Sequence, residues 1–117
     1  MSDSKTHTVK LFFWTAMAGS YILAVLPRDD VPKLTPFGDK SNHTLAFAVL
    51  TLLLLYAYRS RYFSAFVWMF LYGIFIEISQ LFAINRSSEV LDVAADTIGV
   101  LIGITLYHII EKYRSQW

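Results

Sequence analysis

The chain has 117 residues, of which 56% are hydrophobic and 16% are charged, and this balance excludes most soluble domains. Its formal charge of +1 provides no basic surface, so we expect no nucleic-acid partner. It has no cysteine, which excludes disulfide frameworks, thiolate nucleophiles and cysteine-ligated metal. The length fits a single domain over residues 1–117.

The first predicted helix covers about residues 9–26, after a short polar start that we expect to lie outside the helix. Its apolar run, residues 11–26, follows Lys5 and Lys10 and ends at Pro27. A secretory signal peptide is the alternative interpretation of such a run. We favour a retained transmembrane helix, because no small-residue cleavage site follows and further apolar segments do.

The one long predicted loop covers residues 28–39 and contains two prolines, a glycine and charges of both signs. It is either a plain connector or a lid over the membrane surface. The second predicted helix, residues 42–58, follows it. Asp39 suits an N-cap or first-turn position, and His43 lies four residues further on.

The last two predicted helices cover about residues 63–84 and 90–112. Each is long enough to cross the roughly 30 Å hydrocarbon core of a bilayer. The turns after the second and third helices are short, so consecutive helices must be antiparallel. The sequence therefore predicts an all-α fold, a membrane-embedded antiparallel four-helix bundle.

The distribution of lysine and arginine predicts the orientation of this bundle, because cytoplasmic loops carry an excess of both residues. An N-terminus in the cytoplasm divides them into Lys5, Lys10, Arg59, Arg61, Lys112 and Arg114 inside, against Arg28, Lys33, Lys40 and Arg86 outside. The bias favours both termini in the cytoplasm. The polar residues of the helices and of the turn after the third helix then gather at the outer end of the bundle: Asp39, Lys40, His43, Glu77, Gln80, Arg86, Asp92 and Asp96.

Glu77 is the most informative of these residues. A carboxylate inside an apolar helix is costly, so it needs a partner or a function. Arg86 follows nine residues later, with a side chain long enough to reach back to it. A structural pair between Glu77 and Arg86 and a functional carboxylate in an outward cavity therefore both remain open.

His43, Glu77 and Asp92 are the candidate catalytic residues, because an imidazole oriented by a carboxylate can carry a proton. Asp92 alone also fits as a favourable acid in the first turn of a helix. The spacing matches no metal-ligand motif, so we predict neither a metal nor a cofactor. Gly99 and Gly103 form a small-residue face that allows close helix packing, including contact with a second copy in a homo-oligomer.

These residues resemble the pattern of the VanZ-like family of bacterial membrane proteins. The resemblance is carried by Asp39-Lys40 with His43 and Phe47, Gly73 with Glu77 and Gln80, Arg86, Asp92, and Thr97-Gly99-x-x-x-Gly103. It implies a multi-pass protein of the bacterial cytoplasmic (inner) membrane, whose founding relative is linked to teicoplanin resistance. One departure concerns Asp96, which stands where the resemblance leads us to expect asparagine and adds a carboxylate.

The resemblance and the polar residues leave three functions open. The first is a binding protein that engages membrane lipids and an amphipathic envelope ligand, such as a lipid-linked wall precursor or a lipoglycopeptide, in an outward-facing polar cleft. It would contribute to glycopeptide resistance, with Lys40 and Arg86 meeting anionic groups. The second is a membrane-embedded hydrolase or transferase with Glu77 or Asp92 as base and His43 as acid. The third is a proton-linked transporter that uses Glu77 and Asp96.

Overall fold

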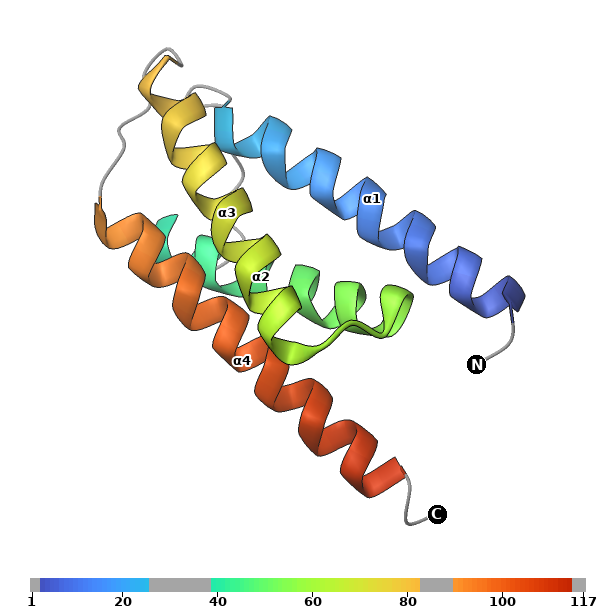
Figure 1. Ribbon diagram of the computed structural model, residues 1–117. Coiled ribbons are helices and arrows are strands. Elements are labelled where there is room, and N and C mark those ends of the chain that lie inside the picture. The colour runs from blue at the N-terminus through green and yellow to red at the C-terminus, as the bar shows by residue number, and fades with distance from the viewer. Residues whose placement is uncertain (1–2, 26–38, 83–89, 115–117) are drawn as a thin grey trace.

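The computed structural model describes residues 3–25, 39–82 and 90–114. These ranges contain four helices and no strand, in the order α1 (Asp3–Val25), α2 (Asp39–Tyr58), α3 (Tyr62–Leu81) and α4 (Val90–Arg114) (Figure 1). The predicted all-α fold is therefore confirmed.

The helices differ from the expected bounds mainly at their ends. The polar start of the chain is helical from Asp3 on, because it holds neither proline nor glycine and Thr8 Oγ1 donates to Ser4 O, 2.9 Å away. α2 begins three residues earlier than expected, at Asp39, and α4 extends to Arg114.

Three of the four helices are long and apolar enough to cross a membrane: Ser4–Val25, Tyr62–Leu81 and Leu91–Arg114. The apolar part of α2, Asn42–Tyr58, is shorter. It rises about 25 Å at about 1.5 Å per residue, against a hydrocarbon core of about 30 Å. α2 is instead the helix that the others enclose, so less of its length faces the surroundings.

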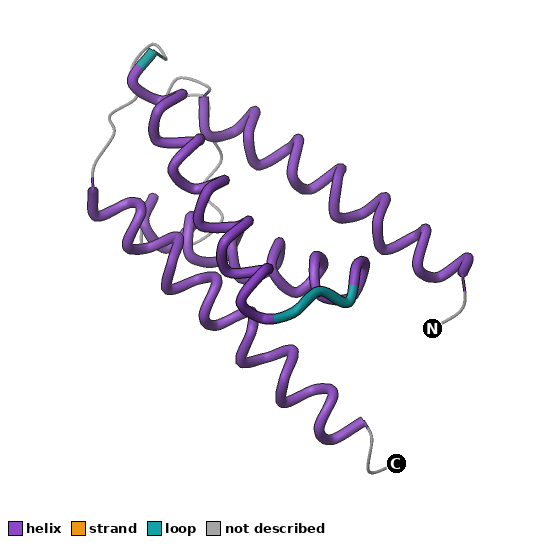
Figure 2. The backbone as a smooth tube through the Cα atoms, viewed as in Figure 1, coloured by secondary structure: helices purple, strands orange, loops and turns teal. Residues whose placement is uncertain are grey.

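The bundle places α2 and α3 between α1 and α4. α2 and α3 each contact all the other helices, whereas α1 and α4 do not approach each other within the described ranges. Figure 1 shows both chain ends on the same side of the molecule. Figure 2 shows that α2 and α3 are joined by a short loop there, at residues 59–61. This is the alternation of direction that an antiparallel bundle requires.

The core is formed mainly by α2. Phe47, Leu50 and Leu55 are almost completely buried, and Met69 of α3 and Val100 of α4 meet them. Water is already absent from a bilayer core, so close van der Waals packing contributes more to helix association there than apolar burial does.

Two glycines set the distance between α2 and α4. A Cβ atom added at Gly99 would lie 2.4 Å from the carbonyl oxygen of Thr44, and one added at Gly103 would lie 2.7 Å from that of Ala48. Gly99 and Gly103 thus form the expected close-packing face, and α2 of the same chain occupies it. A second copy could not use this face without displacing α2, so the bundle itself accounts for the glycine spacing.

Polar contacts join α1 to α3. The Tyr72 hydroxyl donates to Met17 O at 2.9 Å and lies 2.7 Å from Ser20 Oγ. One turn further along, the Tyr21 hydroxyl donates to Ser79 Oγ at 2.9 Å. Hydrogen bonds of this kind hold helices together where apolar surroundings offer no other partner.

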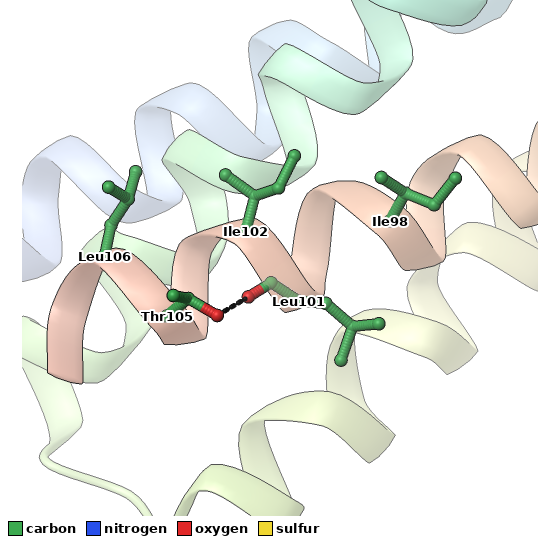
Figure 3. A pocket seen from close by; sticks show the side chains of 5 residues that line it. All are labelled: Ile98, Leu101, Ile102, Thr105 and Leu106. Carbon is green, nitrogen blue, oxygen red and sulfur yellow. Dashed lines mark hydrogen bonds between the residues drawn. The ribbon is translucent and has the colours of Figure 1, made fainter. Parts of the chain in front are cut away.

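The outer face of α4 is apolar. It carries a shallow groove of about 270 Å³ lined by Ile98, Leu101, Ile102, Thr105 and Leu106 (Figure 3). Thr105 Oγ1 donates to the carbonyl oxygen of Leu101 at 2.8 Å, so the only hydroxyl in the groove is satisfied by its own helix. A face of this composition suits contact with lipid acyl chains.

Candidate functional site

The second turns of α2 and α4 bring an imidazole beside a carboxylate. His43 Nδ1 lies 2.9 Å from Asp96 Oδ1. Next to this pair, Thr44 Oγ1 donates to Ala95 O at 3.0 Å. Thr44 is also the residue whose backbone packs on Gly99. The close contact between the two helices therefore determines where the imidazole lies.

The second oxygen of Asp96 is turned toward α3. Asp96 is only 2% exposed, and its Oδ2 atom has no hydrogen-bond partner among the described residues. A Cβ atom at Gly73 would lie 3.0 Å from Oδ2. The carboxylate fits against α3 because residue 73 has no side chain. Glu77, one turn later on that helix, is 6% exposed.

Three helices thus contribute ionisable groups to one small volume. His43, Glu77 and Asp96 each offer a ligand-type atom, and these atoms all lie within 4.8 Å of one another. Asp92, one turn before Asp96, is also buried and acts on His43 electrostatically, as Glu77 does. We refer to His43, Glu77, Asp92 and Asp96 as the polar end of the bundle. Its most accessible member is His43, with 12% of its side chain exposed.

The structure brings His43, Glu77 and Asp96 of the predicted site residues together, and one pairing differs from the expected one. The hydrogen bond of His43 goes to Asp96 rather than to Glu77 or Asp92, the carboxylates expected to orient it. Asp39 and Lys40 belong to the first turn of α2, and their side chains lie outside what the structure describes. Arg86 lies outside the described residues altogether, so the pair expected between Arg86 and Glu77 stays a prediction.

Gln80, another predicted site residue, bonds to α1. Its Nε2 atom donates to Ala24 O at 3.0 Å, and the side chain is 2% exposed. Sequence reasoning did not find this role, because only the packing of α1 on α3 shows that a backbone carbonyl lies within reach of the amide.

Replacing Gln80 by leucine is therefore expected to lower the free energy of unfolding and to have a smaller effect on ligand binding. A hydrogen bond of this type contributes about 1 kcal/mol to the free energy of unfolding. Thermal unfolding of the purified protein in detergent should show the loss. Ser79→Ala, which removes the hydroxyl that Tyr21 contacts beside it, is the matched comparison and should cost a similar amount. An unchanged unfolding temperature for Gln80→Leu would contradict this role.

The opposite end of the bundle, in the residues that the structure describes, carries exposed aromatic side chains instead of buried charged groups. Trp14 Nε1 donates to the Tyr58 hydroxyl at 2.6 Å, and Lys10 Nζ lies 4.9 Å from the centre of the Tyr58 ring. The Tyr62 hydroxyl lies 3.2 Å from His108 Nδ1. All of these side chains except Lys10 are exposed, and such pairings are typical of membrane-interface anchoring. Buried carboxylates are confined, within the described ranges, to the polar end.

Comparison with known proteins identifies the family. The family profile described as VanZ/LLP1 matches residues 5–111, a span that takes in the whole of α2 and α3 and most of α1 and α4. The search of curated proteins and the search of solved structures gave no match. Because the profile covers nearly the entire 117-residue chain, which carries three helices able to cross a membrane, this protein belongs to the VanZ-like family of membrane proteins.

Proposed function

We propose that the polar end of this VanZ-type membrane protein binds an amphipathic envelope ligand, a lipid-linked wall precursor or a lipoglycopeptide. The observation that supports this is the presence of three buried carboxylates, Glu77, Asp92 and Asp96, with the mostly buried imidazole of His43, in a largely apolar bundle. Each such group is costly to remove from water. Gly99 and Gly103 already account for the close packing of α2 on α4, so that packing does not by itself explain the buried charged groups.

The ligand reaches the polar end where α2 and α4 begin and α3 ends. In the proposed orientation this end faces the outside of the bacterial cytoplasmic membrane, with both termini in the cytoplasm. The hydrocarbon chains of the ligand lie along the apolar helix faces. Lys40 and Arg86, which the sequence places at the same end, meet its anionic groups.

Capture of a lipoglycopeptide at this site would keep it from its target in the cell wall. In this proposal, resistance to teicoplanin-type antibiotics arises at the membrane surface, without any change in the wall precursor itself. The resistance phenotype therefore depends on the same residues as ligand retention.

The binding proposal predicts that cations at the polar end matter most. Arg86→Ala and Lys40→Ala should each weaken retention of teicoplanin or of a lipid-linked precursor on proteoliposomes roughly 10- to 150-fold, since a charge-assisted hydrogen bond contributes about 1.5–3 kcal/mol. Glu77→Gln should have a smaller effect. The matched controls are Arg59→Ala and Lys5→Ala, at the other end of the bundle. Equal losses in the variants and the controls would reject the site.

A second candidate function, a membrane-embedded hydrolase or transferase, is favoured by the hydrogen bond between His43 and Asp96. A carboxylate that holds an imidazole in position is the arrangement of a general base. This function predicts that His43→Asn abolishes product formation from a lipid-linked substrate while ligand retention persists. If ligand retention and turnover fall together in His43→Asn, or if neither falls, the enzyme function is rejected and only the binding function is left.

A further inference from the structure

Two carboxylates and one imidazole that converge from three helices are a chemically defined set. Imidazole nitrogen and carboxylate oxygen are both ligands of Zn²⁺, and sites with three protein ligands leave a position open for water or substrate. Two ligands of a tetrahedral ion at about 2.1 Å lie about 3.4 Å apart. His43 Nδ1 and Asp96 Oδ1 are 2.9 Å apart, and one ligand-type atom from each of the three residues lies within 4.8 Å of the others, so no separation in the set is far from that value.

An independent feature of the same place also points to a ligand. Asp96 Oδ2 is buried without a hydrogen-bond partner among the residues described, and burying a polar atom in that state is costly. It lies close against α3 beside Gly73, where an added Cβ atom would be only 3.0 Å away. This oxygen therefore has an unused lone pair next to the helix face that Gly73 shares with Glu77.

We propose that His43, Glu77 and Asp96 form a binding site for a divalent cation, with Zn²⁺ as the preferred ion. The imidazole disfavours Mg²⁺ and Ca²⁺, which take oxygen ligands, and the absence of thiolates disfavours soft ions. Among the remaining ions Zn²⁺ binds such sites more tightly than Mn²⁺, and three protein ligands with one open position suit tetrahedral Zn²⁺ rather than square-planar Cu²⁺ or Ni²⁺. Asp92, one turn away on α4, adds negative charge around the ion.

The cation site deepens the binding function proposed above and rests on it for its role, because both use the polar end. An ion held by three side chains offers its open position to a phosphate or carboxylate group. The ligand's anionic group would then be held by the metal as well as by the cations of the chain. Binding of the metal itself requires no ligand, so the two proposals can be tested separately.

Titration calorimetry of the full-length protein in detergent, after chelator treatment, tests the site. We expect one Zn²⁺ per chain, weaker binding of Mn²⁺ and none of Mg²⁺. His43→Gln and Asp96→Asn should each weaken Zn²⁺ binding at least tenfold, since even changes in groups behind the ligands cost about 10–100-fold. Absence of bound Zn²⁺, or wild-type affinity in both variants, would overturn the proposal.

Matched controls separate the site from adventitious metal binding and from misfolding. His108→Gln and Glu111→Gln change one imidazole and one carboxylate near the end of α4, and should bind Zn²⁺ like the wild type. Gly73→Ala presses on Asp96 Oδ2 without replacing a ligand residue and should weaken binding, whereas Gly19→Ala, with open space around it, should not. Circular dichroism and gel filtration verify that each variant is folded. Zn²⁺ affinity that falls with His108→Gln instead of His43→Gln would place the metal elsewhere.

A second measurement, of ligand retention, distinguishes failure of the metal site from failure of the binding function. Retention of teicoplanin or lipid-linked precursor on proteoliposomes is measured with Zn²⁺ and with a chelator. Retention that persists unchanged in chelator overturns the metal's role and leaves the binding function standing. Zn²⁺ binding without retention under either condition supports the metal site and rejects the binding function.

Discussion

Replacing Gly99 by alanine is expected to force α2 and α4 apart and to cause one of the largest losses of stability that a single methyl group can produce in this protein. The added carbon would lie 2.4 Å from Thr44 O and 2.9 Å from Phe47 Cβ. The first of these is a backbone atom, so the contact cannot be relieved by a side-chain rotation. Overpacking of this kind costs about 1–3 kcal/mol, and a contact with backbone belongs at the upper end.

The control for this variant is Gly19→Ala in α1, where nothing lies within 4 Å of the added carbon. That change should raise stability by up to about 1 kcal/mol, because alanine is the better helix former. Unfolding in detergent, followed by circular dichroism, compares the two variants directly. Equal stability of Gly99→Ala and Gly19→Ala would show that the close approach of α2 and α4 is wrong.

The Gly99 variant also tests whether helix packing positions the polar end. Thr44 lies next to His43, and its hydroxyl bonds to Ala95, which lies next to Asp96. If the helices separate at Gly99, the 2.9 Å contact between His43 and Asp96 is lost with them. Ligand retention should therefore fall together with stability. A destabilised variant that retains ligand fully would show that the polar end does not depend on this packing.

The helices were predictable because their signals are local. Apolar runs interrupted by short polar turns indicate spanning helices irrespective of what packs against them. The beginning of α1 was missed because a polar segment such as residues 3–8 carries no apolar pattern, although nothing in it breaks a helix. The central place of α2 could not be predicted from the sequence either, because contact with three neighbouring helices depends on how the helices are arranged in space.

The sequence identified the four members of the polar end among a larger set of candidates, and it did not identify their pairing. His43, Glu77, Asp92 and Asp96 stand out because charged and polar groups are rare inside apolar helices. Asp92 and Asp96 are one turn apart on one face of α4, so the sequence cannot say which of them lies level with His43. The offset between α2 and α4 decides it, and the contact of Gly99 with Thr44 sets that offset.

The partner of Gln80 could not be predicted from the sequence either. Its place one turn from Glu77 on a polar face predicted a ligand contact, yet its amide bonds to α1. The hydroxyls of Tyr21 and Tyr72 also bond across the α1–α3 contact. A polar residue in an apolar helix therefore signals that a partner exists, and only the arrangement of the helices identifies that partner.

Whether the His43–Asp96 pair serves stability or function can be decided by replacing both members. Asp96→Ala removes one partner from a buried pair and is expected to cost about 3 kcal/mol of unfolding free energy. The double variant His43→Phe/Asp96→Leu replaces the pair by apolar groups of similar shape, and leucine branches as aspartate does. Such replacements are often neutral or stabilising, so the double variant should unfold near the wild type and well above Asp96→Ala.

The measurement is unfolding in detergent with a chelator present, so that bound metal does not contribute to stability. Asp96→Asn, which retains the shape of the side chain and a hydrogen bond to the imidazole, should cost only about 1 kcal/mol. A double variant that is stable and fails to retain ligand would show that the pair is maintained for binding. A double variant that loses as much stability as Asp96→Ala, or more, would instead show that the pair holds α2 and α4 together, and the polar end would then have no need of a ligand to account for its buried charges.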